Sequence, residues 1–173
     1  MRQRFLFGLN IADVSRDELL EIIAGRLETG KPMHIVTVGA LTLMECRNDP
    51  EYKKTLEKAD LLVPDGMGVV CALRVLYWAR VEKHSGADLA WDLFRLAVAL
   101  GKSVYLFGST EKNIKKAASA VEKAHSGIII AGCRNGYFAS GESAMVAVEI
   151  GTSRPAILLA GLGQPAQEKW IEK

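Results

Sequence analysis

The chain has 173 residues, of which 49% are hydrophobic and 24% are charged, and its formal net charge is +2. This composition is typical of a soluble globular protein of this length, so we expect a single domain over residues 1–173. The small net charge excludes a strong polycation built for duplex DNA, and we predict no nucleic-acid partner.

The cysteines and the apolar segments exclude several further classes of protein. Cys46, Cys71 and Cys133 are odd in number and far apart, a pattern that disfavours a disulfide framework or a zinc site. The longest apolar run, residues 67–79, is interrupted by Arg74 and falls short of the ~20 residues that cross a bilayer. We therefore expect a protein of a reducing compartment without a membrane-spanning helix.

The first half of the chain alternates short apolar runs with segments of helical period. The run Ser15-Arg16-Asp17-Glu18 is typical of a capping box, in which Ser and Glu side chains satisfy backbone N–H groups at a helix start. In chain order, we predict a strand at 5–7, a helix at 15–27, a strand at 34–38, helices at 40–48 and 50–58, a strand at 61–63 and a helix at 69–78. The helix at 69–78 is expected to bury Val69, Leu73 and Leu76.

The second half continues the same alternation. We predict a helix at 86–100, a strand at 103–107, a helix from Ser109 or Thr110 to Val121, a strand at 127–131, a helix at 142–150, a strand at 155–160 and a helix at 165–173. Gly151 is expected to end the helix at 142–150, because Gly is favoured just past a helix C-terminus. Strands that alternate with helices of this length predict an α/β fold with a mostly parallel, Rossmann-like sheet and helices on both faces.

Several predicted strands are followed by turns rich in Gly and polar residues. These turns are Thr37-Val38-Gly39, Asp65-Gly66-Met67-Gly68, Gly108-Ser109-Thr110, Asn135-Gly136-Tyr137-Phe138 and Gly161-Leu162-Gly163-Gln164. In a parallel sheet such turns lie along one edge, where open α/β folds bind ligands. Small residues admit a ligand to the backbone, and helix N-termini supply N–H donors, so this edge suits a phosphate or diphosphate. Glycine turns are also ordinary connections between strands and helices.

The established nucleotide fingerprints are absent. Gly66-Met67-Gly68 and Gly161-Leu162-Gly163 both lack the third glycine of the dinucleotide motif, which disfavours a dehydrogenase, and no P-loop motif for ATP is present. One acid, Asp65, follows a predicted strand directly and precedes a helix. It is either a helix N-cap, the commoner role of Asp in this position, or a general base that takes a proton from an attacking hydroxyl.

Six segments of the chain occur in a specific order and spacing. They are Thr37, the run Ala59-Asp60-Leu61-Leu62-Val63-Pro64-Asp65-Gly66-Met67-Gly68, Gly86-Ala87-Asp88-Leu89, Val104-Tyr105-Leu106-Phe107-Gly108, Gly136-Tyr137-Phe138 and Gly161-Leu162-Gly163-Gln164-Pro165-Ala166-Gln167-Glu168-Lys169-Trp170-Ile171. Together they resemble the WecG/TagA/CpsF family of bacterial glycosyltransferases, and the resemblance covers nearly the whole chain.

The resemblance implies an inverting transfer of N-acetylmannosamine, or a related sugar, from a UDP donor. The implied acceptor is a hydroxyl of N-acetylglucosamine on a polyprenyl diphosphate, and the product enters wall teichoic acid or another surface polysaccharide. Neither a cofactor nor a metal ion is implied. The implied location is cytoplasmic, peripheral on the inner face of the cell membrane.

The resemblance also implies roles for individual residues. Asp65 is expected to be the general base, and Thr37 to help bind the sugar. The expected substrate-binding residues are Gly39, Lys83, Gln167, Gly66, Gly108, Gly136, Tyr137, Gly161, Gly163 and Gln164.

The sequence departs from the family pattern at three places. Gly39 stands where the family usually has Asn, and Lys83 where it usually has Arg, so an amide and a planar guanidinium are lost. The resemblance also implies a basic C-terminal, membrane-targeting appendage, which we expect this chain to lack. We therefore expect weak or no turnover, and the alternative is a non-catalytic module that binds a nucleotide sugar or assists assembly. The apolar helix at 69–78 has more apolar surface than one face needs, and we expect a homo-oligomer.

Overall fold

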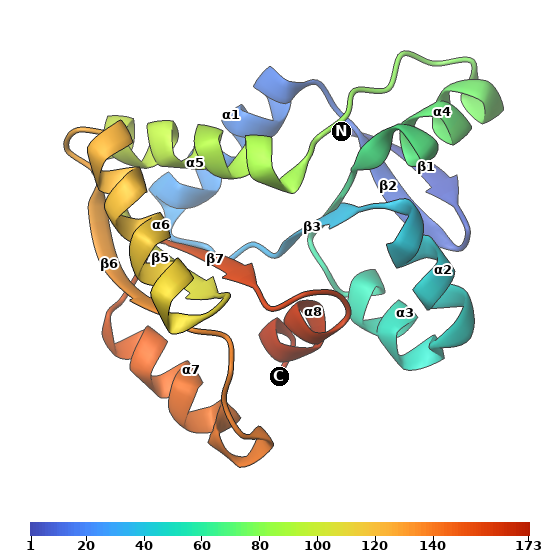
Figure 1. The fold of residues 1–173 in the computed structure, drawn as a ribbon. Coiled ribbons are helices and arrows are strands. Elements are labelled where there is room, and N and C mark those ends of the chain that lie inside the picture. The colour runs from blue at the N-terminus through green and yellow to red at the C-terminus, as the bar shows by residue number, and fades with distance from the viewer. The chain divides into compact units, whose positions relative to one another are not determined.

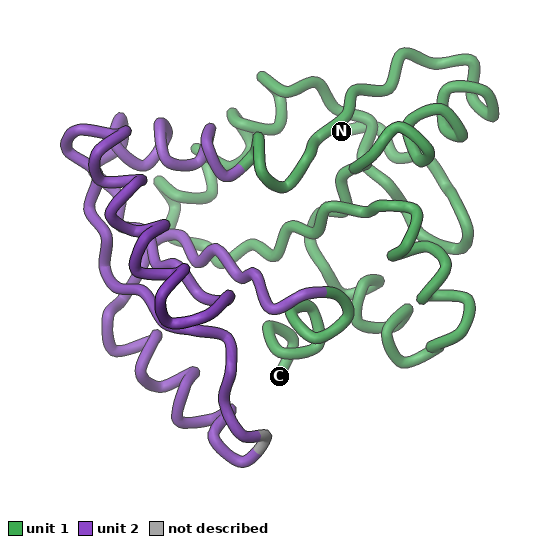
Figure 2. Tube along the Cα trace, in the orientation of Figure 1, with its two compact units in different colours: residues 1–89, 164–173 green, residues 90–163 purple. Residues whose placement is uncertain are grey.

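The computed structural model describes the whole chain except the side chain of Ser140. The chain forms two compact units (Figure 2). Unit 1 consists of Met1–Leu89 and Gln164–Lys173, and unit 2 consists of Ala90–Gly163. The expectation of a single domain over residues 1–173 stays a prediction.

Unit 1 opens with an antiparallel hairpin of β1 (Arg2–Leu6) and β2 (Leu9–Asp13) (Figure 1). Leu6 pairs with Leu9, so the loop has two residues, Phe7 and Gly8, with φ of 49° and 85°. Positive φ at both central residues is what a tight hairpin turn requires. The predicted strand at 5–7 is therefore wrong in extent, and the second strand was not predicted.

Two parallel strands form the second sheet of unit 1. β3 (Ile35–Val38) pairs with β4 (Leu61–Pro64) so that Val38 lies opposite Pro64. The Asp65 N–H donates to the Val38 carbonyl oxygen at 2.8 Å, which extends this pairing by one residue. Because the strands end together, Gly39 and Asp65 leave the sheet at the same edge.

The helices of unit 1 follow the predicted order. They are α1 (Arg16–Thr29), α2 (Ala40–Asn48), α3 (Pro50–Glu57), α4 (Gly66–Tyr77), the first turn of α5 (Gly86–Leu100) and α8 (Ala166–Ile171). The capping box of α1 is confirmed: the Glu18 N–H donates to Ser15 Oγ at 3.2 Å, and the Ser15 N–H donates to Glu18 Oε2 at 2.7 Å.

One hydrophobic core lies within unit 1. It includes Leu6, Leu9, Ile11, Val36, Val38, Leu43, Cys46, Tyr52, Leu56, Leu62, Val69, Leu73 and Val81. Val69 and Leu73 confirm the predicted buried face of α4, but Leu76 is 61% exposed. The prediction that Leu76 is buried is therefore wrong, because the apolar residues of this helix cover more of its circumference than the core can contact.

Unit 2 contains a parallel sheet of three strands in the order β6-β5-β7 (Figure 1). The strands are β5 (Ser103–Gly108), β6 (Ile129–Arg134) and β7 (Ile157–Gly161). β6 starts two residues later than predicted and runs three residues further, with a shift of register against β5 between Val104 and Tyr105. β5 is central, and its residues from Val104 to Gly108 are all buried.

The helices of unit 2 are the rest of α5, α6 (Glu111–Ala124) and α7 (Ser143–Thr152), which follows a short 3-10 turn, η1 (Ser140–Glu142). Thr110, not Ser109, caps α6, because its Oγ1 accepts a hydrogen bond from the Asn113 N–H at 3.3 Å. Gly151 does not end α7 as predicted; it lies inside the helix, and Ser153 is the C-cap.

The predicted α/β fold with mostly parallel strands is confirmed: five of the seven strands pair in parallel among the described residues. Among the same residues, none of the helices combines the length and the apolarity that a bilayer crossing requires.

Candidate functional site

Asp65 occupies the N-cap position of α4 but does not cap it. Its backbone is extended, with φ of −114° and ψ of 146°, and its side chain makes no hydrogen bond to the first turn of the helix. The residue is only partly buried, and no described residue donates a hydrogen bond to its carboxylate or forms an ion pair with it. An N-cap Asp that serves only the helix would accept an N–H of the first turn. The carboxylate of Asp65 is therefore free to accept a proton, or a hydrogen bond from the hydroxyl of a ligand.

Three helix N-termini meet around the end of β3. A Cβ built on Gly86, at the start of α5, would lie 3.4 Å from Thr37 Oγ1. A Cβ built on Gly68, in the first turn of α4, would lie 4.0 Å from the Cβ of Ala40, which opens α2. The N–H groups and partial positive charges of these helix starts favour an anion close to Thr37.

A polar network ties the C-terminal segment of unit 1 to this place. Thr42 Oγ1 donates to Gln164 Oε1 at 2.7 Å and accepts the Gly39 N–H at 3.1 Å. The other end of the amide, Gln164 Nε2, donates to the Thr37 carbonyl oxygen at 3.3 Å. Gln164 therefore joins the end of β3 to the start of α2.

Two ion pairs join α8 to the two ends of α3, and α8 also carries a buried carboxyl group. Lys169 Nζ pairs with Asp49 Oδ2 at 2.6 Å, and Lys58 Nζ pairs with Glu172 Oε1 at 2.5 Å. Glu168, the neighbour of Lys169 on α8, is buried, and its burial raises the pKa of its carboxyl. Burial, followed by the charge of Glu168, also raises the pKa of Tyr52.

Two further predicted residues of unit 1 lie beside this network. Gln167 is on α8, one turn after Gln164, and its Nε2 donates to Glu168 Oε1 at 2.8 Å. Lys83 is exposed and precedes His84, whose N–H donates to the Pro64 carbonyl oxygen at 2.8 Å. The segment that carries Lys83 therefore runs along the end of β4.

In unit 2 the predicted glycines gather at the carboxyl ends of the three strands. Gly108 has a φ of 140°, and a Cβ on it would lie 2.6 Å from the Gly161 carbonyl carbon. A Cβ on Gly136 would lie 3.0 Å from the Cα of Gly108, and the Gly136 N–H donates to the Ser109 carbonyl oxygen at 2.9 Å. These approaches leave no room for a side chain, so each of the two positions requires glycine.

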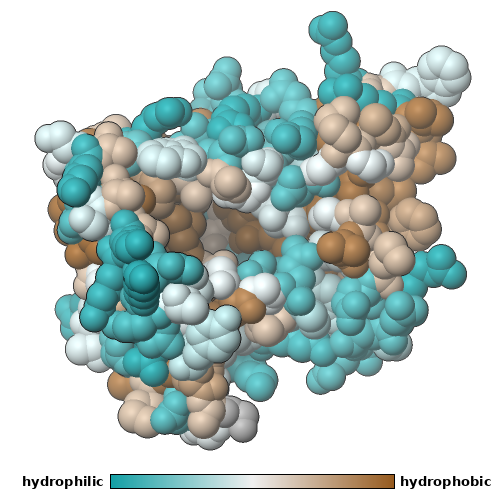
Figure 3. Space-filling view, viewed as in Figure 1, coloured by the Kyte–Doolittle hydropathy of each residue, from teal (hydrophilic) through white to brown (hydrophobic). Residues whose placement is uncertain are grey.

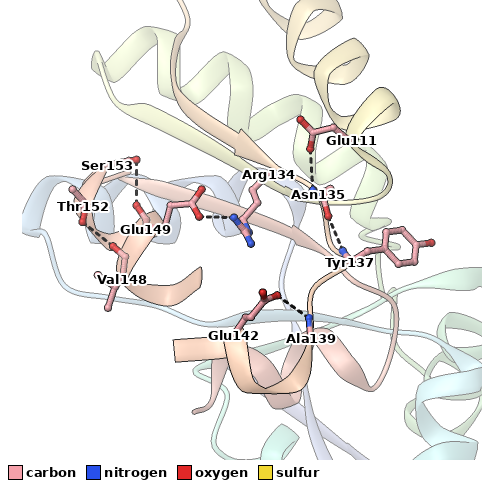
Figure 4. Close-up of polar contacts among 10 residues, drawn as sticks. All are labelled: Glu111, Arg134, Asn135, Tyr137, Ala139, Glu142, Val148, Glu149, Thr152 and Ser153. Carbon is pink, nitrogen blue, oxygen red and sulfur yellow. Dashed lines mark hydrogen bonds and ion pairs between the residues drawn. The ribbon is translucent and has the colours of Figure 1, made fainter. Parts of the chain in front are cut away.

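The loop after β6 exposes the aromatic side chain of Tyr137, which follows Gly136 directly (Figure 4). Asn135 Oδ1 accepts the Tyr137 N–H at 3.0 Å, and Asn135 Nδ2 donates to Glu111 Oε2 at 2.9 Å. The ring of Tyr137 points away from these contacts and is 76% exposed. Hydrogen bonds from Lys115 and Asn135 hold the pKa of Glu111, which lies in the first turn of α6, below its usual value.

The candidate residues thus form two groups. Thr37, Gly39, Asp65, Gly66 and Gln164 lie together in unit 1, with Lys83 and Gln167 on adjoining segments. Gly108, Gly136, Tyr137 and Gly161 lie together in unit 2, whereas Gly163 is exposed, with no atom within 4 Å of a Cβ built on it.

The sequence pattern missed Thr42, which holds both Gly39 and Gln164. Its signal was its spacing, because a hydroxyl three residues after an N-cap can reach back to the N-cap N–H. Gly86 was recognised as part of a segment but not as a neighbour of Thr37. No three His, Cys, Asp or Glu side chains cluster as metal ligands in the part of the chain that the structure describes. The expectation of a metal-independent protein stays a prediction.

Comparison with known proteins decides the family. The sequence model described as "Glycosyl transferase WecG/TagA/CpsF family" matches residues 4–173. The chain belongs to this family. The resemblance noted in the six segments is therefore confirmed.

Family relatives carry names that specify their reactions. The chain is 31% identical over 147 residues to an N-acetylglucosaminyldiphosphoundecaprenol N-acetyl-beta-D-mannosaminyltransferase of Bacillus spizizenii, which covers 85% of the chain and 56% of the relative. It is 29% identical over 137 residues to a Bacillus subtilis protein of the same name, with 79% and 53% covered. A UDP-Gal:alpha-D-GlcNAc-diphosphoundecaprenol beta-1,4-galactosyltransferase of Shigella boydii is 27% identical over 121 residues, with 69% and 51% covered. The chain spans about half the length of these relatives.

Proposed function

We propose that the chain is the core of an inverting glycosyltransferase. It moves N-acetylmannosamine, or a related sugar, from a UDP donor to a hydroxyl of N-acetylglucosamine on a polyprenyl diphosphate. The names of the relatives support a diphosphoundecaprenol-linked acceptor, and they support a mannosaminyl or galactosyl group as the sugar transferred. The product belongs to a teichoic acid linkage unit or another surface polysaccharide, and the protein works at the cytoplasmic face of the membrane.

The observation that carries this proposal is the unengaged carboxylate of Asp65. In the proposed reaction it accepts the proton of the acceptor hydroxyl while the hydroxyl oxygen attacks the anomeric carbon of the donor. The new carbon–oxygen bond forms on one face of the sugar as the bond to UDP breaks on the other, and UDP leaves with the electron pair. A positioned general base of this kind contributes roughly 10²–10⁴-fold to the rate.

The remaining residues bind the substrates in this proposal. Thr37 lies at the end of β3, beside the end of β4 that leads to Asp65, and offers a hydroxyl to the sugars. Gln164, whose amide bonds to Thr42 and to the Thr37 carbonyl oxygen, holds this segment in place. The UDP diphosphate lies at the carboxyl-end edge of the sheet of unit 2, where Gly108, Gly136 and Gly161 gather (the glycine edge), and the exposed ring of Tyr137 stacks on the uracil. The proposal assigns no role to a metal or a cofactor.

Calorimetric titration of UDP tests the nucleotide site in unit 2. We expect saturable binding of one UDP per chain, and Tyr137→Ala should weaken it by about tenfold, because stacking of an aromatic ring on a base is worth ~1–3 kcal/mol. Met145→Ala is the control, since Met145 is a comparably exposed apolar residue of α7 in the same unit. No heat of binding at millimolar UDP would contradict the proposal. Binding without any sugar transfer would favour the alternative, a non-catalytic nucleotide-sugar module.

A further inference from the structure

We propose that an apolar pocket in unit 1 binds the first isoprene units of the polyprenyl diphosphate. This inference rests on the proposed function, because that function supplies an acceptor with a hydrocarbon tail. The pocket has a volume of about 250 Å³ and is lined by Phe7 of the hairpin turn, Leu43, Met44 and Arg47 of α2, and Val69 and Ala72 of α4.

The pocket lies next to the candidate catalytic residues of the same unit. Its lining also includes Ala40 and Gly68. Ala40 follows Gly39 directly, and Gly68 is three residues after Asp65 in the first turn of α4. A ligand in the pocket therefore has its end close to the helix starts that surround Thr37.

The lining combines hydrocarbon walls with one cation. Arg47 is the only charged residue among the lining residues that the structure describes, and its guanidinium makes no hydrogen bond or ion pair with the described residues. A guanidinium without a partner is suited to two oxygens of a phosphate. A prenyl diphosphate has this combination, an anionic head directly attached to a branched hydrocarbon chain. A water-soluble nucleotide would leave the apolar walls unused.

The size of the pocket limits how much of the chain it holds. Its volume of about 250 Å³ lies just below the ~300–1,000 Å³ of sites for drug-sized ligands, so it accepts a short stretch of hydrocarbon. Further apolar side chains are exposed on the same elements, namely Phe5, Leu41, Met67, Val75, Leu76 and, next to α4, Trp78. Figure 3 shows hydrophobic residues gathered over this part of unit 1. They extend the apolar surface beyond the pocket.

Methionine methyl signals in NMR report on the pocket directly. Met44 lines it, whereas Met145 lies on α7 in unit 2 and serves as an internal control. Titration of farnesyl diphosphate below its micelle concentration should shift the Met44 signal saturably and leave the Met145 signal in place. Geranyl diphosphate, one isoprene unit shorter, should bind at least tenfold more weakly, because each buried methylene contributes to affinity.

The role of Arg47 is tested with a matched pair of variants. Arg47→Gln should raise the Kd for farnesyl diphosphate about tenfold and leave the Kd for farnesol, which has no phosphate, unchanged. Arg80→Gln removes an exposed cation outside the pocket and should change neither Kd.

Four results would overturn the inference. Farnesyl and geranyl diphosphate could bind equally well, which would mean that the hydrocarbon makes no contact. Met44 could respond to pyrophosphate as strongly as to farnesyl diphosphate. It could shift with protein concentration alone, which would assign the pocket to a second copy of the chain, or with phospholipid vesicles as readily as with the prenyl compound, which would assign it to the bilayer.

The outcome is separable from that of the proposed function. A Met44 response without UDP binding would keep the pocket and remove the transferase. UDP binding and sugar transfer, with no shift of the Met44 signal on titration of farnesyl diphosphate, would keep the transferase and remove the pocket.

Discussion

At the scale of single residues, unit 1 contains two acids in opposite environments. Asp65 is partly exposed, with a carboxylate that no described residue engages. Glu168 is 1% exposed, and its carboxyl lies close to the buried hydroxyl of Tyr52. The first arrangement leaves an acid available for chemistry, whereas the second lowers stability because a buried carboxylate is poorly solvated. Asp65 is therefore the candidate for a role in catalysis, whereas Glu168 is expected to affect the stability of the fold.

Glu168→Gln should change how stability depends on pH. Burial raises the folded-state pKa of Glu168 above its ordinary value of 4.5. Between the ordinary and the raised pKa the folded chain binds more protons than the unfolded chain, so this group lowers stability as pH rises through that window. Gln cannot ionise, and the variant should gain on the order of 1 kcal/mol over the wild type above the window, and not below it.

The measurement is urea unfolding at a series of pH values. Glu21→Gln is the control, because Glu21 is exposed on α1, and it should follow the wild-type profile. A constant difference between Glu168→Gln and the wild type at all pH values would show that ionisation of Glu168 is not the cause.

At the scale of elements, the glycine edge of unit 2 depends on backbone contacts that a methyl group would break. Gly108→Ala should lower the free energy of unfolding by roughly 2–4 kcal/mol, because φ of 140° is strained for Ala and its Cβ would meet the Gly161 carbonyl. Gly151→Ala should raise it by about 0.5–1 kcal/mol, since Gly151 lies inside α7 with no atom within 4 Å of the added Cβ.

Thermal unfolding of the two variants tests this contrast. The opposite signs separate the specific contact at Gly108 from the general effect of replacing glycine by alanine. Equal shifts of Tm in both variants would contradict the packing that brings the ends of β5 and β7 together.

Element by element, local signals in the sequence predicted the fold well where the chemistry is local. The capping box at Ser15, the helix at 40–48 and the helix at 86–100 follow from side chains within one or two turns. The hairpin was missed because it places the bulky Phe7 at positive φ, which no local pattern indicates. Gly151 was predicted to end its helix, but α7 continues past it to Thr152.

The candidate site was predictable to a similar extent. Strand ends place Gly39 and Asp65 at one edge, and the alternating pattern anticipates this. The link from Thr42 to Gln164 joins residues 122 positions apart in the chain, and no periodicity or spacing can reveal such a contact. The pocket beside α2 and α4 was also unforeseen, since the apolar surplus of α4 predicted an interface and not a cavity.

At the scale of the whole molecule, the proposed catalytic and nucleotide-binding residues belong to different units (Figure 2). Asp65, Thr37 and Gln164 belong to unit 1, whereas the glycine edge and Tyr137 belong to unit 2. The account therefore predicts that proton transfer and nucleotide binding can be damaged separately. The expected homo-oligomer stays a prediction, which light scattering over a range of protein concentrations can test.

Asp65→Asn tests the central claim most directly, with sugar transfer to N-acetylglucosamine on a short-chain prenyl diphosphate and UDP affinity measured on the same preparation. The variant keeps the shape of the side chain and removes its basicity, so the rate of transfer should fall at least ~10²-fold while the Kd for UDP stays unchanged. Asp17→Asn, at an exposed acid of α1, should alter neither quantity. Transfer at the wild-type rate by Asp65→Asn would contradict the assignment of Asp65 as the general base.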